Sequence, residues 1–239
     1  DSQGNTIFDH ADYTRYTDYI REGVKNWSYM KFPFISSLGA DNGWYRVGPL
    51  ARVNNCDYFN TPLAEKERQE FKAVSNNKPL QSTLAFHWAR LIELLHCTEA
   101  IKKLLNDPEI SGSELINKGD MQNCGIGVIE APRGTLFHHY EIDDDGIVNR
   151  ANLIVSTTNN NQAMNESIRQ VASTYLDGQH LTEPLLNQIE VAIRAYDPCL
   201  SCATHAMGKM PLEISLYDEN EKLIDRLEKR ASGQISRTV

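Results

Sequence analysis

The segment 197–205, Asp-Pro-Cys-Leu-Ser-Cys-Ala-Thr-His, constrains this chain more than any other part of it. Its Cys-x-x-Cys spacing allows Cys199 and Cys202 to bind one metal centre, because a turn that opens a helix brings both sulfurs to the same side. Pro198 suits the first turn of a helix, where the partial positive charge favours thiolate. His205 follows three residues after Cys202 and can bind in or beside the same cluster. The segment therefore predicts a redox or metal site.

Spacing alone leaves other kinds of site open. A Cys-x-x-Cys pair also occurs in dithiol oxidoreductases and as half of a structural zinc site. A zinc-binding module would use Cys199, Cys202 and His205 and would need a fourth ligand. A dithiol oxidoreductase would need a βαβ context, which the helical pattern of this chain does not indicate.

The complete nonapeptide resembles the C-terminal metal-binding signature of the large, catalytic subunit of nickel-iron hydrogenases, with wording most similar to the bidirectional, NAD-reducing branch. Two upstream segments extend the resemblance: 45–52, Tyr-Arg-Val-Gly-Pro-Leu-Ala-Arg, and 130–134, Glu-Ala-Pro-Arg-Gly. In that family the first segment belongs to the scaffold and the second is diagnostic. The resemblance runs from about Tyr45 to His205 and implies the helical body of such a subunit.

The resemblance implies a nickel-iron centre that carries carbon monoxide and cyanide on the iron. Cys199 would be a terminal nickel ligand, Cys202 would bridge nickel and iron, and His205 would bind a nearby Mg²⁺ ion. A magnesium ion usually prefers oxygen donors, so the histidine assignment depends on the resemblance and not on ligand chemistry.

Four more residues complete the predicted site. Arg133, preceded by Pro132, would face the iron, because a guanidinium is a planar donor that stays charged and can bond a cyanide. An isolated Pro-Arg-Gly would indicate only an ion pair, but its co-occurrence with the nonapeptide places Arg133 in the site. Asp197 would pair with Arg133 and fix its orientation. Thr157, in a Ser-Thr-Thr run predicted at the end of a strand, would bond the second cyanide.

The family provides its four thiolates as two Cys-x-x-Cys pairs, and this sequence contains only the second pair. The sequence starts at Asp1 without a methionine. We therefore expect the C-terminal part of a longer subunit, with a truncated, inactive hydrogenase-derived module as the alternative.

The implied reaction is heterolytic H₂ oxidation and proton reduction. Electrons would pass to a small subunit that carries an iron-sulfur cluster. No Gly-x-Gly-x-x-Gly occurs here, so NAD would be reduced by separate diaphorase subunits. The family also implies a maturation endopeptidase that cuts after His205. The chain would then consist of a hydrogenase part, 1–205, and an extension, 206–239, that is removed on maturation.

Composition limits the partners and the compartment. Lys and Arg number 24 against 32 Asp and Glu, a net charge of −8, so we expect neither nucleic acid nor an anionic membrane as partner. No run approaches the roughly 18 apolar residues of a membrane span, and no signal-peptide core is present, so we expect a cytoplasmic protein without membrane insertion. The five cysteines are odd in number and sparse, which favours reduced thiols.

Hydrophobic periodicity predicts the secondary structure. The expected helices are 13–27, one that begins at Pro62, a core helix over 82–105, then 164–175 and 184–194. Residues 31–40 are expected to be a loop, and strands 135–142 and 147–155 to form a hairpin around an Asp-Gly turn. The tail, from Leu212, is expected to be a hairpin with a frayed end. The predicted fold class is mainly α with a small antiparallel β-hairpin element (α+β).

Overall fold

The structure is a computed structural model that describes residues 1–178, 180–200, 212–230 and 232–238. The α-helices are α1 (Tyr16–Tyr19), α2 (Gly39–Asn42), α3 (Pro49–Asn55), α4 (Pro62–Val74), α5 (Ala85–Leu104), α6 (Ser156–Asn159), α7 (Asn161–Tyr175) and α8 (Glu183–Ala195). The strands are β1 (Ile20–Lys25), β2 (Ser28–Ile35), β3 (Cys124–Ala131), β4 (Gly134–Ile142), β5 (Val148–Ile154), β6 (Leu212–Tyr217), β7 (Leu223–Lys229) and β8 (Ile235–Thr238). Short 3₁₀ helices are η1 (Tyr13–Arg15), η2 (Ser36–Leu38) and η3 (Pro108–Ser111).

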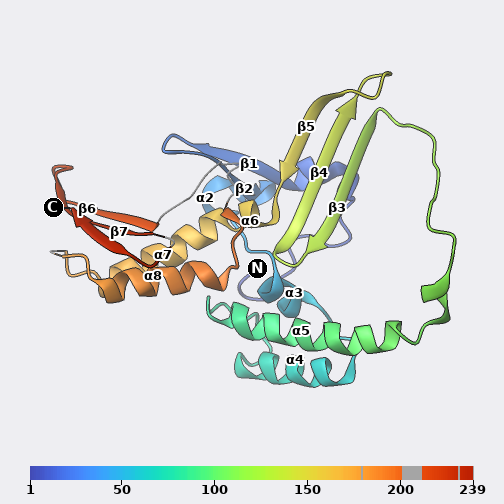
Figure 1. The fold of residues 1–239 in the computed structure, drawn as a ribbon, viewed down its shortest axis with the longest axis horizontal. Coiled ribbons are helices and arrows are strands. Elements are labelled where there is room, and N and C mark those ends of the chain that lie inside the picture. The colour runs from blue at the N-terminus through green and yellow to red at the C-terminus, as the bar shows by residue number, and fades with distance from the viewer. Residues whose placement is uncertain (179, 201–211, 231, 239) are drawn as a thin grey trace.

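The described residues form three antiparallel sheets, β1-β2, β3-β4-β5 and β6-β7-β8. Sheet β3-β4-β5 projects from one end of the helical body, and sheet β6-β7-β8 lies beside α7 and α8 at the other end (Figure 1). The prediction of a mainly α fold with one small hairpin is therefore wrong. Short strands leave a weaker pattern in the sequence than helices of several turns, because strand preference depends strongly on the neighbouring strands.

The first of these errors lies at the N-terminal end. The predicted helix over 13–27 is limited to η1 and α1, after which the chain continues as β1. Strand β1 pairs with β2, so that the predicted loop 31–40 is strand as far as Ile35. In this register Gly23 lies opposite Phe32, whose carbonyl oxygen would be 3.4 Å from a Cβ on Gly23. Pairing with β2 therefore overrides the helical spacing of residues 13–27.

The elements that have strong local signals in the sequence form as predicted. Helix α4 begins at Pro62, and α5 falls inside the predicted range 82–105. Helix α8 begins after Thr182, whose side chain accepts a hydrogen bond from the Leu185 amide at 3.3 Å. Strands β4 and β5 form the predicted hairpin, with Gly146 in the turn at φ 80°.

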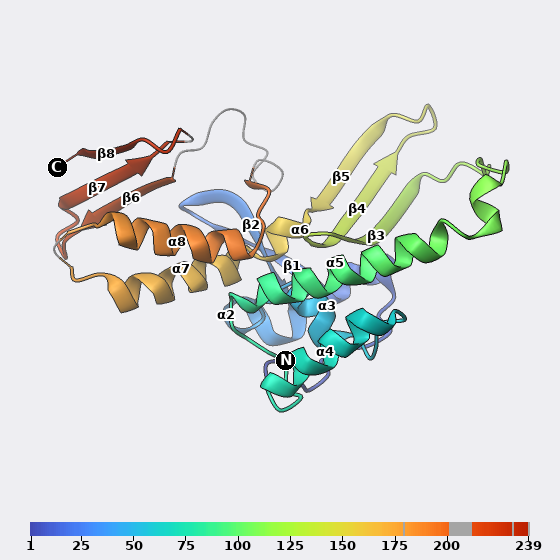
Figure 2. The same ribbon diagram turned by 60° about the horizontal axis from the view of Figure 1, so that its bottom comes forward.

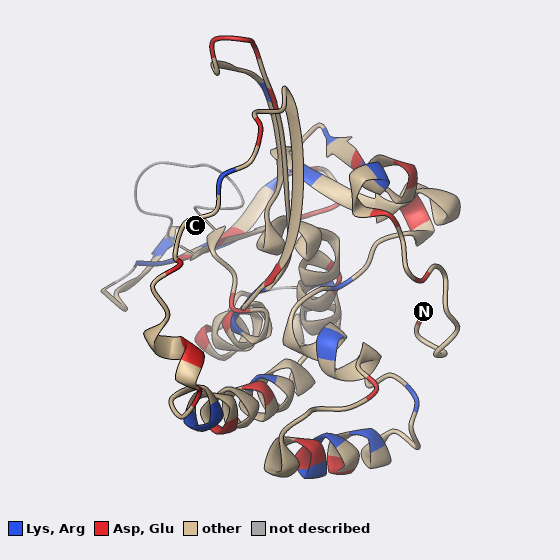
Figure 3. Ribbon diagram, turned by 90° about the vertical axis from the view of Figure 1, so that its right-hand side faces the viewer, with Lys and Arg blue, Asp and Glu red and all other residues tan. Residues whose placement is uncertain are grey.

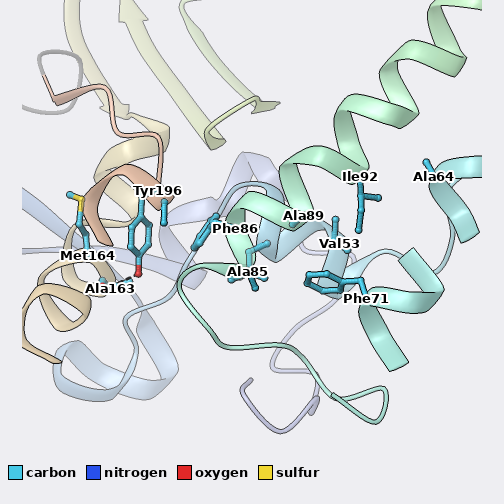
Figure 4. Packing of buried hydrophobic residues seen from close by; sticks show 12 residues of the cluster. Val53, Ala64, Phe71, Ala85, Phe86, Ala89, Ile92, Ala163, Met164 and Tyr196 are labelled. Atoms are coloured by element: carbon cyan, nitrogen blue, oxygen red, sulfur yellow. Dashed lines mark hydrogen bonds between the residues drawn. The ribbon is translucent and has the colours of Figure 1, made fainter. Parts of the chain in front are cut away.

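Helix α5 organises the main hydrophobic core. Its residues Phe86, Ala89 and Ile92 are at most 2% exposed and face α3 and α4 on one side (Figure 4). On the other side the ring of Phe86 packs on the ring of Tyr196, which directly follows α8, with centroids 4.8 Å apart. One helix thus connects the α3-α4 layer to the chain segment after α8.

The core helix predicted over 82–105 is buried on one face only. Leu91 and Ile101 are 62% and 56% exposed, and Leu105, just past the helix, is 66% exposed. Leucine and isoleucine therefore occur on both faces of α5, and periodicity alone cannot choose between two apolar faces. The buried face is the one that carries Phe86 and Ala89, which share a core with Val53 of α3 and with Tyr196 after α8.

Strands β6, β7 and β8 form a packed sheet. Leu227 of β7 is 4% exposed and packs with Leu185 and Ile189 of α8, and the sheet lies over this helix in Figure 2. Lys229 Nζ lies 2.5 Å from Glu190 Oε2 of α8. Strand β8 pairs with β7, so the predicted frayed end of the tail is wrong. Backbone pairing with β7 makes this segment a strand, although its polar side chains do not predict one.

Charged side chains are interspersed along the surface helices. Lysine and arginine alternate with glutamate along α4, while acidic residues gather at the tip of the β4-β5 hairpin (Figure 3). None of the helices in the described part of the chain is both long enough and apolar enough to cross a membrane.

The junction between α6 and α7 is a buried run of three asparagines that bind distant backbone groups. The Asn160 side chain accepts a hydrogen bond from the Val47 amide at 2.9 Å, and its residue is 1% exposed. The Asn161 side chain donates to the Lys31 carbonyl at 2.9 Å. These contacts join α7 to β2 and to the loop before α3, and the first gives a partner to the amide of the buried residue Val47.

Asn159 connects this junction to β4 and to Tyr45. The side-chain amide of Asn159 donates to the Thr135 carbonyl of β4 at 2.8 Å, and its side-chain oxygen accepts a hydrogen bond from the Tyr45 hydroxyl at 2.5 Å. Burial raises the pKa of Tyr45 far above its usual range, with a smaller contribution from the charge of Glu22. Tyr45 therefore keeps its proton and donates to Asn159 at neutral pH.

Two glycines allow the β3-β4 turn to approach the loop before α3. Gly134, at φ 134°, has so little space that a Cβ would overlap the Val47 side chain and would lie 2.9 Å from the Gly48 amide nitrogen. Gly48, at φ 96°, has a similar constraint, because its Cβ would lie 2.9 Å from the Arg133 carbonyl oxygen. Both positions require glycine for conformation and for space.

We expect Asn160→Ala to lower the free energy of unfolding by about 1–3 kcal/mol, because the buried Val47 amide would lose its acceptor. Denaturant unfolding of the chain measures this change. Asn149→Ala is the matched control, since Asn149 is exposed on β5 and should change stability by less than about 0.5 kcal/mol. Equal stability of the two variants would contradict the assigned role of Asn160.

We expect Gly134→Ala to destabilise the chain by about 3 kcal/mol or more, because strain in the backbone adds to the clash with Val47. Gly146→Ala is the control: it has a positive φ of 80° but nothing within 4 Å, so backbone strain alone should cost about 1 kcal/mol. Thermal unfolding of both variants separates the clash from the strain. A smaller loss for Gly134→Ala than for Gly146→Ala would be inconsistent with the close approach.

Candidate metal centre

The β3-β4 turn presents two of the predicted site residues. β3 ends at Ala131, which pairs with Gly134 at the start of β4, so Pro132 and Arg133 are the two turn residues. The side chain of Arg133 is 43% exposed and leaves the turn toward the segment after α8. Pro132 fixes the backbone on the N-terminal side of this arginine.

The segment after α8 is located by the core. The Tyr196 hydroxyl donates to the Ala163 carbonyl of α7 at 3.1 Å and lies 2.8 Å from Ser167 Oγ. One residue earlier, the Ala195 carbonyl accepts from Arg90 of α5 at 3.0 Å. These contacts fix Tyr196 to α7 and Ala195 to α5. The residues that follow Tyr196 therefore start from a defined position.

Arg133 and Asp197 meet, although 64 residues separate them in the sequence. Arg133 Nε donates to the Asp197 backbone carbonyl at 2.8 Å and lies 3.3 Å from Asp197 Oδ2. Asp197 has a left-handed φ of 49°, and its amide donates to the Arg194 carbonyl at 2.9 Å. This conformation, which aspartate tolerates better than most residues, allows one residue to offer both a carbonyl and a carboxylate to the guanidinium.

The structure also brings Thr157 to the beginning of the cysteine motif. The Cys199 amide donates to Thr157 Oγ1 at 3.1 Å. Thr157 is 4% exposed and lies in α6, a single helical turn that follows β5, rather than in a turn that ends the strand. This hydrogen bond from the backbone of the motif to a buried hydroxyl places Cys199 beside Thr157.

The remaining predicted ligands, Cys202 and His205, lie outside the described residues. Within the described ranges, His, Cys, Asp and Glu form no group of three or more that could hold a metal ion. The described part of the site thus contains a cysteine, a guanidinium, a carboxylate and a buried hydroxyl, from Cys199, Arg133, Asp197 and Thr157. This set fits part of a thiolate-bound metal centre whose outer ligands accept hydrogen bonds.

Arg52 of α3 is a residue near the site that the sequence did not single out. Its guanidinium donates to the carbonyls of Ala131 and Pro132, at 2.9 and 3.0 Å, and so contacts the turn that carries Arg133. Arg52 is the last residue of the segment 45–52, but the resemblance assigns that segment only to the scaffold. Identifying this contact required the three-dimensional approach of α3 to the turn.

A separate groove of 780 Å³ lies between α7, α8 and the loop before α5. Its lining includes Leu84, Val171 and Val191, and it contains none of the predicted site residues. The candidate centre is therefore distinct from this groove and lies where the β3-β4 turn, α6 and the end of α8 meet (Figure 1).

Comparison with known proteins identifies relatives of this chain. The sequence profile of the family described as nickel-dependent hydrogenase matches residues 1–205. The NAD-reducing hydrogenase HoxS subunit beta of Cupriavidus necator is 49% identical over 218 residues, which are 90% of this chain and 45% of that protein. A vhc-type F420-non-reducing hydrogenase subunit of Methanococcus voltae is 44% identical over 215 residues, 88% of this chain and 44% of that protein.

The fold is also similar to that of a solved relative. A crystal structure of an NAD⁺-reducing [NiFe]-hydrogenase in the H₂-reduced state matches 83% of this chain and 44% of its own chain. The TM-score is 0.79 and the sequence identity is 53%. This chain spans less than half of the length of the relatives that it matches. With a profile match over residues 1–205 and 49% identity to a hydrogenase subunit, the chain belongs to the nickel-dependent hydrogenase family.

Proposed function

We propose that this chain is the C-terminal part of the catalytic subunit of a nickel-iron hydrogenase, which oxidises H₂ heterolytically or reduces protons. The observation that carries the proposal is the pairing of Arg133 with Asp197 one residue before the Pro-Cys of the motif, with Cys199 held on Thr157. Membership of the family supports the same reaction. The remaining two thiolates would come from the part of the subunit that this chain does not span.

The roles of the cysteines follow from ligand chemistry, and the role of His205 follows from the resemblance to the family. Cys199 and Cys202 would bind nickel, with Cys202 bridging to iron, because soft thiolates suit these metals. His205 would bind Mg²⁺. When bound, a nickel-iron centre with carbon monoxide and cyanide on the iron would supply the open metal position at which H₂ is split.

The other residues would contact the cyanide ligands of the iron or orient a residue that does. Arg133, preceded by Pro132, would donate to a cyanide and stay charged beside the open position. Thr157 would donate to the second cyanide through its hydroxyl. Asp197 would hold the guanidinium of Arg133 in orientation, which is the contact seen at 2.8 and 3.3 Å.

The proposal includes partners. Electrons would leave through a small subunit with an iron-sulfur cluster and pass through diaphorase subunits to NAD. The 49% identity to a subunit of an NAD-reducing hydrogenase supports this route over the other hydrogenase branches. The cytoplasmic location stays a prediction.

We expect Cys199→Ser, made in the complete subunit, to abolish nickel retention, because a hydroxyl is a poor ligand for a soft metal. Elemental analysis of the purified protein measures the nickel, iron and zinc per subunit. Cys97→Ser is the matched control, because the Cys97 thiol is exposed on α5 and should leave nickel at the wild-type level. Nickel equal to wild type in Cys199→Ser would contradict the ligand assignment. Zinc alone in the wild type would favour the structural zinc-binding alternative over a hydrogenase.

We also propose that the extension 206–239 is removed by a maturation endopeptidase once nickel is inserted. Two observations support a boundary near His205: the family profile match ends there, and residues 212–238 form a sheet of their own. This sheet packs on α8 through Leu227 and Lys229, so it could hold the preceding cysteine segment in an accessible position during metal loading.

We expect the active, nickel-loaded subunit to end at His205, because metal loading would complete the function of the extension. Intact mass spectrometry of the active and the metal-free forms makes the measurement. The mass should fall by that of the 34 residues 206–239 (239 − 205) in the active form only. An active subunit that still ends at Val239 would rule out processing.

A further inference from the structure

Arg52 of α3 occupies the space between α5 and the β3-β4 turn. On the α5 side it forms a bidentate ion pair with Glu93, with Nε at 2.6 Å from Oε1 and Nη2 at 2.7 Å from Oε2. The side chain of Arg52 is 24% exposed. A bidentate, partly desolvated pair of this kind fixes the plane of a guanidinium as well as its position.

The remaining N–H groups of Arg52 face the turn. They donate to the carbonyls of Ala131 at 2.9 Å and Pro132 at 3.0 Å, and to Glu130 Oε2 at 2.8 Å. The two carbonyls belong to the residues directly before Arg133. Arg52 therefore fixes the backbone from which the Arg133 side chain departs.

The backbone after Arg133 is fixed in the same way. The Gly134 carbonyl accepts from Ser156 Oγ at 2.8 Å, and the Thr135 carbonyl accepts from Asn159 at 2.8 Å. With both flanks held, the direction of the Arg133 side chain is determined by the turn at its base and by Asp197 at its tip.

The chemistry of Arg52 suits this task. Burial alone would lower the pKa of Arg52, but its hydrogen bonds and charge interactions with Glu93 and Glu130 outweigh burial and raise it. The group is thus a permanent cation with donors in a rigid fork, and it bridges the Glu93 carboxylate on one side to the Glu130 carboxylate and two carbonyls on the other. Lysine has the charge without the fork and cannot reproduce these contacts together.

We propose that Arg52 is a positioning residue for Arg133: by holding the carbonyls of Ala131 and Pro132 against α5, it aims the Arg133 guanidinium at Asp197 and the beginning of the cysteine motif. Glu93 is the anchor of this arrangement on α5. The consequence for H₂ turnover rests on the proposed function, whereas the effect on the Arg133–Asp197 contact does not.

The first experiment uses this chain without metal. Two-dimensional ¹H–¹⁵N spectra of arginine side chains report the Nε–H of Arg133, assigned by its loss in Arg133→Lys. In the wild type this proton is hydrogen-bonded to the Asp197 carbonyl and should exchange slowly with water. Arg52→Gln and Arg52→Lys should shift the signal toward that of a free arginine and speed its exchange. Glu93→Gln should have the same effect to a smaller extent.

Arg68→Gln is the matched control. Arg68 is 8% exposed and forms an equivalent bidentate pair with Glu65, with both N–O distances 2.7 Å, and a contact to the Cys56 carbonyl. It lies on α4 and contacts no residue of the turn. Arg68→Gln should lower stability much as Arg52→Gln does, and it should leave the Arg133 signal unmoved. An Arg133 signal that is unchanged in all three variants, Arg52→Gln, Arg52→Lys and Glu93→Gln, would overturn the proposal.

The second experiment uses the complete, metal-loaded enzyme. Arg52→Gln should shift the infrared stretching bands of iron-bound cyanide and lower kcat by about tenfold to a hundredfold, with nickel content and KM for H₂ nearly unchanged. Arg68→Gln should leave the bands and kcat at the wild-type values. Absence of cyanide bands from the wild type would refute the proposed function and leave the metal-free result as the test of positioning. Wild-type cyanide bands that do not move in Arg52→Gln would refute the positioning role at the centre.

Discussion

The structure depends on the close approach of two backbone segments at Gly48 and Gly134. A Cβ on Gly134 would lie 2.9 Å from the Gly48 amide nitrogen, and a Cβ on Gly48 would lie 2.9 Å from the Arg133 carbonyl oxygen. No side chain fits between these segments, so the turn that carries Arg133 rests directly on the start of α3. This contact places Arg52, one helical turn into α3, within reach of the same turn.

The hydrophobic core determines the other half of the site. Phe86 of α5 packs on Tyr196, and Tyr196 in turn bonds the Ala163 carbonyl of α7. Asp197 follows immediately and meets Arg133. Helix α5 therefore serves both halves, because it holds Tyr196 through Phe86 and the arginine turn through Glu93. A small displacement of α5 would be transmitted to the Arg133–Asp197 pair from both sides, since a packed core has little room to absorb it.

The elements predicted correctly are those whose signals are local. Pro62 begins α4 and the Asp-Gly turn closes the β4-β5 hairpin, because a proline ring and a glycine with positive φ restrict the backbone by themselves. Sheet β1-β2 was missed because residues 13–27 also have a helical spacing of apolar residues, and the sheet β6-β7-β8 was underestimated because the residues of β8 are polar. The exposed face of α5 was misjudged because both of its faces are apolar.

The sequence by itself determined the chemical groups of the candidate site: two thiols at metal-binding spacing, the arginine after Pro132 and the aspartate before Pro198. Residue type and spacing are local properties of the sequence, and they also indicated the family. Only the tertiary structure decided that Arg133 meets Asp197 across 64 residues, that Thr157 receives the Cys199 amide, and that Arg52 holds the turn. The physical reason is that each contact joins elements whose relative position is set by packing at Gly48, Gly134 and Tyr196, which no local pattern encodes.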